Sequence, residues 1–283
     1  MSIPNFKFPT EVDFEKMERD EYAAAKNNKE NMSYWLPKIE TSNTRNKSSL
    51  KIPKTKTEKL DFNTIQWLRS DSYSKEAIQE FNNLLISKLG DFESGKTIFM
   101  KTGVFSNKFN FKDAIVHDRN NIGQQFLDIF YTSMCLGVPL IDEVVFRELI
   151  EDKEDRPKIY SGMPLHTEYR VFFDFDTNNV LGVSNYWHPE EMERYLSDND
   201  KGVYVAHKDI LLEEFNGLKD DVALEVAIWM NGVDTLEGKW SVDVMKNGNK
   251  IWIIDMARMQ RSALVNRMEP VTIPEGYIMS NEE

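Results

Sequence analysis

The sequence predicts a packed chain of mixed helices and strands, of the α+β or the α/β class. Its 283 residues are 41% hydrophobic and 12% aromatic, which supplies enough apolar surface for one large core or two small ones. From residue 61 onward, stretches with apolar residues at helical spacing alternate with shorter stretches in which polar and apolar residues alternate. An Asn-Gly pair at 247–248 separates two of these shorter stretches and is a strong signal for a β-hairpin.

The first 60 residues differ from the rest of the chain in charge. They contain 12 Lys and Arg against 9 Asp and Glu, whereas residues 61–283 contain 23 against 38. Residues 11–32 form a polar run compatible with a helix, and the apolar residues 34–37 could dock it onto the body. Residues 42–59 combine Ser, Thr, Asn and Lys with few large apolar groups, so they bury too little surface to offset the entropy of ordering. We therefore expect residues 1–60 to form a helical or flexible arm with an exposed basic linker.

The first half of the body is predicted to contain two helices and two strands. The helices span residues 74–89 and 121–136, and the strands span residues 97–101 and 143–150. Gly90 follows the first helix, where a glycine commonly ends a helix because it tolerates a left-handed backbone.

The second half of the body is predicted to contain two hairpins separated by a helix. Residues 168–175 and 180–185 flank an Asn-Asn turn, and residues 240–245 and 250–256 flank the Asn-Gly turn. A helix is expected between the hairpins, over roughly 207–230.

The composition excludes several classes of protein. The formal net charge of −12 argues against sequence-independent binding of nucleic acid, because a polyanion is repelled by an acidic surface. Cys135 is the only cysteine, which excludes an intrachain disulfide and a cysteine-based zinc cluster. No apolar stretch has the length of a membrane span, and the N-terminus lacks the pattern of a secretion signal. We expect a cytoplasmic protein with neither membrane nor nucleic acid among its partners.

One string matches a phosphate-binding loop in its letters. Residues 90–97 satisfy the pattern G-x4-G-K-[ST], but a helix is predicted before them and a strand after them. A phosphate loop requires the opposite order, with the helix N-terminus facing the phosphates. Asp91 and Glu93 would also place negative charge inside the cradle. We interpret the string as a helix-to-strand turn.

Basic residues near strand ends are the first candidates for a ligand site. Lys101 lies at the end of a predicted strand, before the small and polar residues of the loop 102–108, where a lysine could reach phosphate oxygens. Taken alone, its position favours an ordinary lysine at a strand end, and only its place in a series of motifs favours a ligand site. Glu168 and Arg170 share one face of a strand because side chains alternate; an exposed ion pair is the alternative interpretation.

Two acidic residues within apolar strands are the most informative. Asp243 and Asp255 each lie among Val, Ile and Trp, where an ionised carboxylate is costly unless it is compensated. Counting outward from the turn places Asp243 opposite residue 252, about three residues out of register with Asp255. Two carboxylates suit a hard cation such as Mg²⁺, which commonly uses one or two carboxylates together with substrate phosphates. A capping role for Asp243 and a structural, hydrogen-bonded role for Asp255 are the alternatives.

Four short motifs, taken in their order along the chain, resemble those of the ATP-grasp superfamily. The likeness covers roughly residues 95–260, and it is greatest to the cell-division-cycle branch that assists assembly of a translation initiation factor. The motifs that carry it are Lys101…Ser106…Lys112-Asp113-Ala114, Val145-Phe146-Arg147-Glu148-Leu149, Glu168-Tyr169-Arg170-Val171-Phe172 and Asp243…Ile253-Ile254-Asp255. The resemblance implies an α+β fold in which two subdomains with antiparallel sheets clasp a nucleotide. Residues 61–150 would form the N-terminal and central subdomain and residues 151–283 the C-terminal subdomain.

The resemblance also implies roles for individual residues in binding Mg-ATP. Lys101 would contact the α- and β-phosphates, Ser106 and Lys108 would lie in a loop over the phosphates, Arg147, Glu148, Leu149 and Ile150 would surround the adenine, Glu168 and Arg170 would lie near ribose or phosphate, and Asp243 and Asp255 would hold Mg²⁺. The superfamily often has a metal-binding Asn two residues after the last acid, where this sequence has Ala257. Arg258 follows and could contact a phosphate or an acyl phosphate, so Lys101, Arg170 and Arg258 are the candidate catalytic residues.

Three functions stay open at this point. The first is an ATP-dependent carboxylate–amine ligase that acts through an acyl phosphate. The second is a non-catalytic or weakly catalytic assembly chaperone that binds Mg-ATP. The third is a nucleotidyltransferase such as an RNA ligase, although Lys101-Thr-Gly-Val lacks the Asp of the K-x-D-G nucleophile motif. The acceptor substrate or protein partner is unknown, and the basic residues 42–59 are a candidate contact for it.

Overall fold

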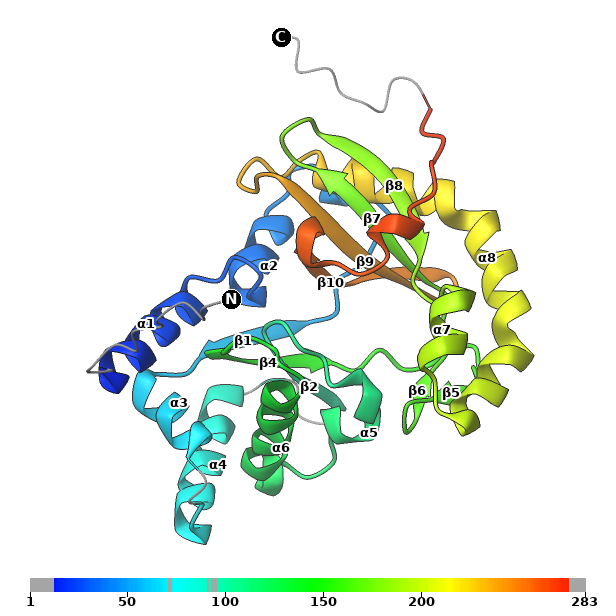
Figure 1. Ribbon diagram of the computed structural model, residues 1–283. Coiled ribbons are helices and arrows are strands. Elements are labelled where there is room, and N and C mark those ends of the chain that lie inside the picture. Colours follow the sequence, from blue (N-terminus) through cyan, green and yellow to red (C-terminus); the bar gives the residue numbers. More distant parts are fainter. Residues whose placement is uncertain (1–12, 71–72, 91, 93–95, 275–283) are drawn as a thin grey trace, which may run out of the picture.

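The computed structural model describes residues 13–70, 73–90, 92 and 96–274. Two four-stranded sheets lie one above the other, and each has helices on its outer face (Figure 1). Within the described residues, all pairs of named strands are antiparallel. The α+β class with antiparallel sheets is therefore confirmed.

The first sheet is built from four strands and covered by helices on one side. Its order is β1 (Thr55–Lys59), β4 (Glu143–Glu148), β2 (Ile98–Thr102) and β3 (Ile115–Val116), and its covering helices are α3 (Phe62–Arg69), α4 (Lys75–Leu89) and α6 (Ile122–Cys135). Helix α4 begins where the Ser74 hydroxyl accepts the Ala77 N–H at 3.1 Å, and it ends at Gly90, whose φ is 54°. Ile98 and Val144 pack against Phe126 of α6 in one apolar core.

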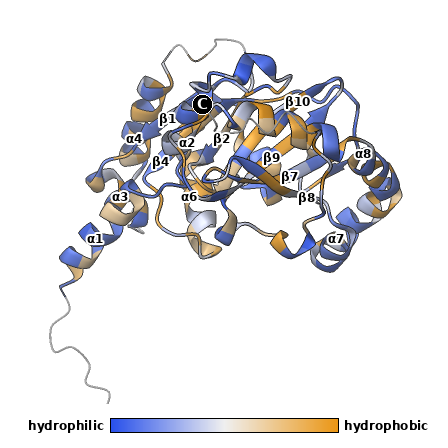
Figure 2. Cartoon of the chain, turned by 90° about the horizontal axis from the view of Figure 1, so that it is seen from above, coloured by the Kyte–Doolittle hydropathy of each residue, from blue (hydrophilic) through white to orange (hydrophobic). Residues whose placement is uncertain are grey.

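The second sheet packs against the longest helix of the described chain. Its order is β10 (Lys250–Arg258), β9 (Lys239–Asn247), β7 (Glu168–Asp174) and β8 (Asn179–Asn185), and α8 (Asp198–Met230) covers its outer face. Because side chains alternate along a strand, Tyr169 and Val171 point into the core with Phe215 and Val226 of α8. Phe173 lies in the same core, and Glu168, Arg170 and Phe172 face the other side of the sheet. Figure 2 shows β7 and β9 as largely hydrophobic strands.

The N-terminal elements belong to the packed body. Helix α1 (Phe14–Lys26) leads to α2 (Met32–Glu40), in which Trp35 is fully buried, as expected of an apolar clasp. The prediction that residues 42–59 form an exposed loop is wrong in its second half, because Thr55–Lys59 are strand β1. Backbone hydrogen bonds to β4 stabilise an edge strand whose polar side chains need no burial, and composition does not reveal this. The boundaries at residues 60 and 150 stay predictions.

Short elements complete the fold. They are α5 (Phe111–Ala114), α7 (Pro189–Tyr195), the two-stranded pair β5 (Lys158–Ile159) and β6 (Met163–Pro164), and the 3₁₀ turns Arg45–Lys47, Lys108–Asn110, Arg119–Asn121, Met259–Arg261 and Val265–Arg267. None of the helices in the described part of the chain combines the length and apolar character that crossing a membrane requires.

Two sequence predictions on helices have clear outcomes. Helix α8 begins earlier than expected, because the Ser197 hydroxyl accepts the Asp200 N–H and starts the helix ahead of its apolar residues. In the string that matches a phosphate loop, residues 91 and 93–95 lie outside the described residues. Helix α4 precedes the string and strand β2 follows it, as a helix-to-strand turn requires.

Candidate functional site

A cleft lies between the two sheets and gathers most of the predicted site residues. Its lining comprises Phe99, Lys101, Ser106, Lys108, Phe111, Arg147, Glu148, Leu149, Ile150, Met163, Pro164, His166, Glu168, Tyr186, Asp243, Met245, Ile254 and Asp255. The first sheet contributes one wall through β2 and β4, and the second sheet contributes the other through β7, β9 and β10. Segments up to 154 residues apart in sequence therefore meet at one site.

The two ends of the cleft differ in chemistry. At the charged end, Ser106, Lys108, Asp243 and Asp255 also line an adjoining hollow that reaches Arg170. At the apolar end, residues 148–150 also line a second hollow, beside the Asn-Gly turn. The cleft thus joins a region of charged groups to one walled by Leu and Ile side chains.

The register of the hairpin brings the two acidic residues together. Asp243 on β9 and Asp255 on β10 are direct cross-strand partners, so the predicted offset of about three residues is wrong. Asn247 pairs with Lys250, so the turn is centred one residue later than counted, which accounts for two residues of the offset; a register shift between Ile253 and Asp255 supplies the third. A β-bulge of this kind leaves no pattern in the sequence.

Arg170 holds one of these carboxylates. It lies opposite Asp243 on the neighbouring strand β7, and its Nε and Nη2 atoms lie 2.7 and 2.8 Å from the two carboxylate oxygens of Asp243. This bidentate geometry is the strong form of an arginine–carboxylate pair. Arg170 is 12% exposed and Asp243 9% exposed in their side chains, so the exposed ion pair considered from the sequence is not what forms.

Lys101 joins the two sheets across the cleft. It is 1% exposed, and its Nζ lies 2.5 Å from Oδ2 of Asp255. Lys101 belongs to β2 of the first sheet and Asp255 to β10 of the second. A buried ammonium is stable only with a close partner, so Lys101 is not an ordinary solvated lysine at a strand end.

Arg147 has an unused hydrogen-bond donor. Its Nε donates to Thr55 Oγ1 at 3.1 Å and its Nη1 donates to the carbonyl of Ile254, which forms a second link between the sheets. Its Nη2 is buried and has no hydrogen-bond partner among the described residues. Burial lowers the pKa of Arg147 to about 10, and the nearby Asp255 opposes that shift. An acceptor on a ligand would satisfy this donor, whose isolation costs about 1–3 kcal/mol.

Glu168 and Lys108 both line the cleft and carry opposite charges that interact. Burial raises the pKa of Glu168 to about 8, with Lys108 lowering it and Asp243 raising it further. The Lys108 ammonium lies 4.1 Å from the ring centre of Tyr186 and contacts the hydroxyl of that tyrosine. The positive charge of Lys108 is thus held on the cleft wall by an aromatic face.

Arg258 is not brought to the cleft. Its N–H donates to Glu30 Oε1 at 3.2 Å, and its guanidinium lies 5.5 Å from the ring centre of the buried Trp240. Because strand residues alternate, Arg258 shares the face of Met256, which packs in the core, and lies opposite the face of Asp255. The structure therefore offers no contact for the catalytic role expected of Arg258.

Several lining residues had no role in the sequence analysis. Met163, Pro164 and His166 come from the connection between the sheets, and Tyr186 follows β8. Strands β5 and β6 have two residues each, too short for any periodicity to appear. His166 has no metal-ligand spacing, and only the fold brings it to the cleft.

The acidic residues limit what a metal ion could use. Asp243 and Asp255 are adjacent and on the cleft face, and each is engaged by a cation, Arg170 or Lys101. The described part of the chain contains no group of three or more His, Cys, Asp or Glu placed to hold a metal ion. A divalent ion at this pair would therefore need further oxygen ligands from a substrate, which is the usual situation for Mg²⁺.

Comparisons with known proteins give structural matches only. No protein-family model matches the sequence, and no curated protein matches it. Among solved structures, Cdc123 from Schizosaccharomyces pombe is 13% identical with a TM-score of 0.47, covering 89% of this chain and 96% of that one. D-alanine–D-alanine ligase from Bacillus anthracis, complexed with ATP, is 10% identical with a TM-score of 0.35, covering 84% and 59%. An ATP-grasp RimK domain protein from Sphaerobacter thermophilus is 13% identical with a TM-score of 0.33, covering 81% and 58%.

Proposed function

We propose that the cleft binds Mg-ATP and that the protein is an ATP-dependent carboxylate–amine ligase acting through an acyl phosphate. The observation that supports this most directly is the pairing of Lys101 with Asp255 across the cleft, with Asp243 beside Asp255. A buried lysine and two adjacent carboxylates from opposite walls suit the phosphates and the metal ion of a nucleotide. The apolar end of the cleft suits the base.

At the charged end, phosphate oxygens would replace Asp255 as the partner of Lys101. Lys101 and Lys108 supply positive charge for phosphate oxygens, and Arg147 supplies its unused Nη2 donor. Once Lys101 turns to a phosphate, Asp255 becomes available, with Asp243, to hold Mg²⁺. Bound Mg²⁺ would neutralise phosphate charge during phosphoryl transfer.

At the apolar end, some backbone groups are already engaged. The N–H of Glu148 donates to the Lys54 carbonyl at 2.8 Å, and the N–H of Leu149 donates to the Thr97 carbonyl at 3.0 Å. A base in this position would therefore be read by other groups, of which the backbone of Ile150 is the next in the chain. Apolar contacts with Leu149 and Met245 would hold its faces.

The adjoining hollow would receive the second substrate. It combines Arg170 and Arg261 with the apolar residues Phe105 and Val138. A carboxylate held there lies next to the charged end, where its oxygen would attack the γ-phosphorus, break the bond to the β,γ-bridging oxygen and form an acyl phosphate with ADP as the leaving group. An amine then displaces inorganic phosphate from that intermediate. The protein contributes chiefly by positioning the reactants and by stabilising charge.

One specific observation favours a second candidate, a protein that binds Mg-ATP with little or no turnover while it assists a partner. Ala257 cannot supply a metal ligand where the superfamily often has Asn, and Asp243 is engaged on both oxygens by Arg170. Release of ADP over hours, from protein with excess Mg-ATP and a panel of candidate acceptors, separates the two functions. Tight binding without release supports the second candidate.

Binding measurements on two variants test the nucleotide site. Lys101→Met keeps the length of the side chain but removes its charge, and Asp255→Asn removes the candidate metal ligand. We expect each to weaken Mg-ATP binding at least about tenfold, or roughly 1.4 kcal/mol, by isothermal titration calorimetry. Lys208→Ala is the control, since Lys208 on α8 forms an ion pair with Glu193 on α7 at 2.9 Å and is not among the residues that line the cleft. Wild-type affinity in both cleft variants would exclude this site.

The nucleotidyltransferase alternative has its own test. Lys101 is engaged by the carboxylate of Asp255 at 2.5 Å, and the residues that follow it lack the Asp of the K-x-D-G nucleophile motif. Incubation with α-labelled ATP followed by denaturing electrophoresis should therefore leave the protein unlabelled, and a covalent label on Lys101 would overturn the ligase proposal.

A further inference from the structure

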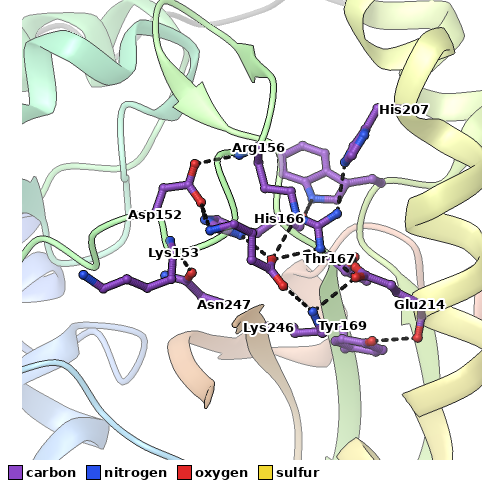
Figure 3. Close-up of polar contacts among 12 residues, drawn as sticks. Asp152, Lys153, Arg156, His166, Thr167, Tyr169, His207, Glu214, Lys246 and Asn247 are labelled. Carbon is purple, nitrogen blue, oxygen red and sulfur yellow. Dashed lines mark hydrogen bonds and ion pairs between the residues drawn. The ribbon is translucent and has the colours of Figure 1, made fainter. Parts of the chain in front are cut away.

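Residues 151–167 connect the two sheets and are held by a network of charged side chains, most of which do not line the cleft. We call residues 151–167 the wall segment, because Met163, Pro164 and His166 within it line the cleft. Figure 3 shows the network, in which side chains of the wall segment meet Glu214 of α8 and Lys246 of β9.

Glu214 is the centre of this network. Its Oε1 accepts from Arg156 Nη2 at 2.6 Å and from Lys246 Nζ at 3.1 Å. The hydroxyl of Thr167 donates to its Oε2, and the hydroxyl of Tyr169 donates to its backbone carbonyl at 3.0 Å. The Glu214 carboxylate thus holds the wall segment and β9 together, and the backbone carbonyl of the same residue adds a contact to β7.

Within the wall segment, Glu154 connects the network to the cleft. Its carboxylate accepts from Lys246 Nζ at 2.5 Å and from Arg156 Nε at 2.8 Å, and lies 3.4 Å from His166 Nδ1. These cations hold the pKa of Glu154 at about 2 against the effect of burial. On the other side of the ring, Asp152 lies 3.4 Å from His166 Nε2. The His166 ring thus lies between two carboxylates of its own segment, with Nδ1 toward Glu154, and its Nε2 has no hydrogen-bond partner among the described residues.

The ends of the wall segment are also tied down. Asp152 accepts the N–H of Glu154 at 2.9 Å and the N–H of Arg156 at 2.8 Å. Asn247 accepts the N–H of Lys153 at 2.9 Å and donates to the Glu151 carbonyl at 2.7 Å. These hydrogen bonds hold the start of the wall segment in one conformation. That start directly follows residues 148–150, which lie at the apolar end of the cleft.

The placement of this network suits the control of geometry better than the gain of stability. Arg156 is 8% exposed and His166 2% exposed, and desolvating such groups offsets most of what their ion pairs contribute. A satisfied polar network nevertheless selects one arrangement, because each member needs its partner. Here the arrangement that is selected is the position of a cleft wall.

We propose that Glu214 is a positioning residue of the nucleotide site. Through Arg156, Lys246 and Thr167 it holds the wall segment against α8 and β9, so that Met163, Pro164 and His166 are placed against the base of a bound nucleotide. This inference rests on the proposed function. Glu214 itself is not among the residues that line the cleft, so it acts through its neighbours.

The experiment compares two glutamates on the same helix. Glu214→Gln removes the charge but keeps the shape. Glu225→Gln is the matched control, because Glu225 accepts from Ser48 Oγ at 2.8 Å and from the Ser49 N–H at 2.6 Å and does not line the cleft. For each protein the dissociation constants of ATP, AMP and inorganic tripolyphosphate are measured by calorimetry in the presence of Mg²⁺.

The pattern across the three ligands distinguishes positioning from general damage. We expect Glu214→Gln to weaken ATP and AMP by the same factor, about tenfold, and to leave tripolyphosphate within about twofold, because only the base meets the wall segment. Glu214→Asp, which retains the charge, should recover part of the loss. Glu225→Gln should bind all three like the wild type. An unchanged affinity of Glu214→Gln for AMP, or an equal loss for tripolyphosphate, would overturn the proposal.

A second measurement keeps failure of this inference separate from failure of the proposed function. If the wild type binds no nucleotide, the proposed function fails, and hydrogen–deuterium exchange then decides on the wall segment. Faster exchange in Glu214→Gln confined to residues 151–167, with β2 and β4 unchanged, supports a wall held by Glu214. Unchanged exchange there would show that Glu214 holds nothing in place.

Discussion

Single residues in this cleft are defined by their surroundings more than by their type. Glu168, Arg147 and Lys101 are each nearly buried at 7%, 6% and 1% exposure, so each depends on a neighbour for its charge. Lys101 has the Asp255 carboxylate at 2.5 Å, whereas Glu168 forms no ion pair within the described residues, and burial is the largest cause of its raised pKa. The consequence for Glu168 can be measured without any ligand.

Glu168 should make stability fall as the pH rises. Its pKa is about 8 in the folded protein against 4.5 for an ordinary glutamate, so the folded state binds an extra proton between these values. The stabilisation is fully present below about pH 4.5 and is lost as the pH rises to about 8. Glu168→Gln has no titrating group at this position and does not lose this stabilisation. Between pH 5 and pH 8, the free energy of unfolding of the wild type should therefore fall, relative to that of the variant, by on the order of 1 kcal/mol or more.

Chemical denaturation at several pH values checks this. Glu193→Gln is a suitable control, because Glu193 is a surface residue whose pKa is lowered by Lys208. Parallel profiles for the wild type and Glu168→Gln would mean that the carboxyl of Glu168 titrates normally.

At the scale of elements, α2 is predicted to be part of the folding unit. Trp35 of α2 is fully buried and belongs to the core that covers the second sheet. Trp35→Ala should lower the free energy of unfolding by about 3–5 kcal/mol, because it leaves a cavity in a packed core. Tyr195→Ala on α7, at a side chain that is 68% exposed, should change it by less than about 0.5 kcal/mol. Urea denaturation measures both, and a small effect of Trp35→Ala would restore the interpretation of an independent arm.

The elements also show where sequence reasoning succeeds and where it stops. Helices α4 and α6 and the hairpin β9–β10 follow from periodicity and turn residues, which are local signals. Strand β1 was missed because its partner β4 lies more than 80 residues away and the polar edge strand has no apolar alternation. The pairing of Asp243 with Asp255 depends on a β-bulge, whose extra residue no spacing rule supplies.

Some residues of the candidate site could be predicted from the sequence, and others could not. Lys101, Asp243 and Asp255 could be selected because a charge in or beside an apolar strand is unusual. His166 and the network around Glu214 could not, because their importance arises from contacts between α8, β9 and an irregular connection. Arg258 lies away from the cleft for a local reason, since alternation places it on the face opposite Asp255.

At the scale of the whole molecule, the two sheets are joined at the floor of the cleft by polar contacts. Lys101 reaches from β2 to Asp255 of β10, and Arg147 reaches from β4 to the carbonyl of Ile254. Residues 151–167 link the same two sheets along the chain. A ligand that binds both walls therefore acts on the relative stability of the two halves, and it stabilises the folded protein as a unit.

Mg-ATP should accordingly raise the melting temperature of the full chain. A ligand that binds only the folded state at 100 times its dissociation constant adds about 2.7 kcal/mol to the free energy of unfolding. For a protein of this size, that corresponds to an increase of roughly 5 to 10 °C in melting temperature. Differential scanning calorimetry with ATP, with Mg²⁺ and with both separates the contributions. Because Asp243 and Asp255 are each engaged by a cation and need phosphate oxygens to complete a metal site, Mg²⁺ alone should give no increase. An increase with Mg²⁺ alone would mean that the protein holds the metal without the nucleotide, and no increase with Mg-ATP would exclude the cleft as a nucleotide site.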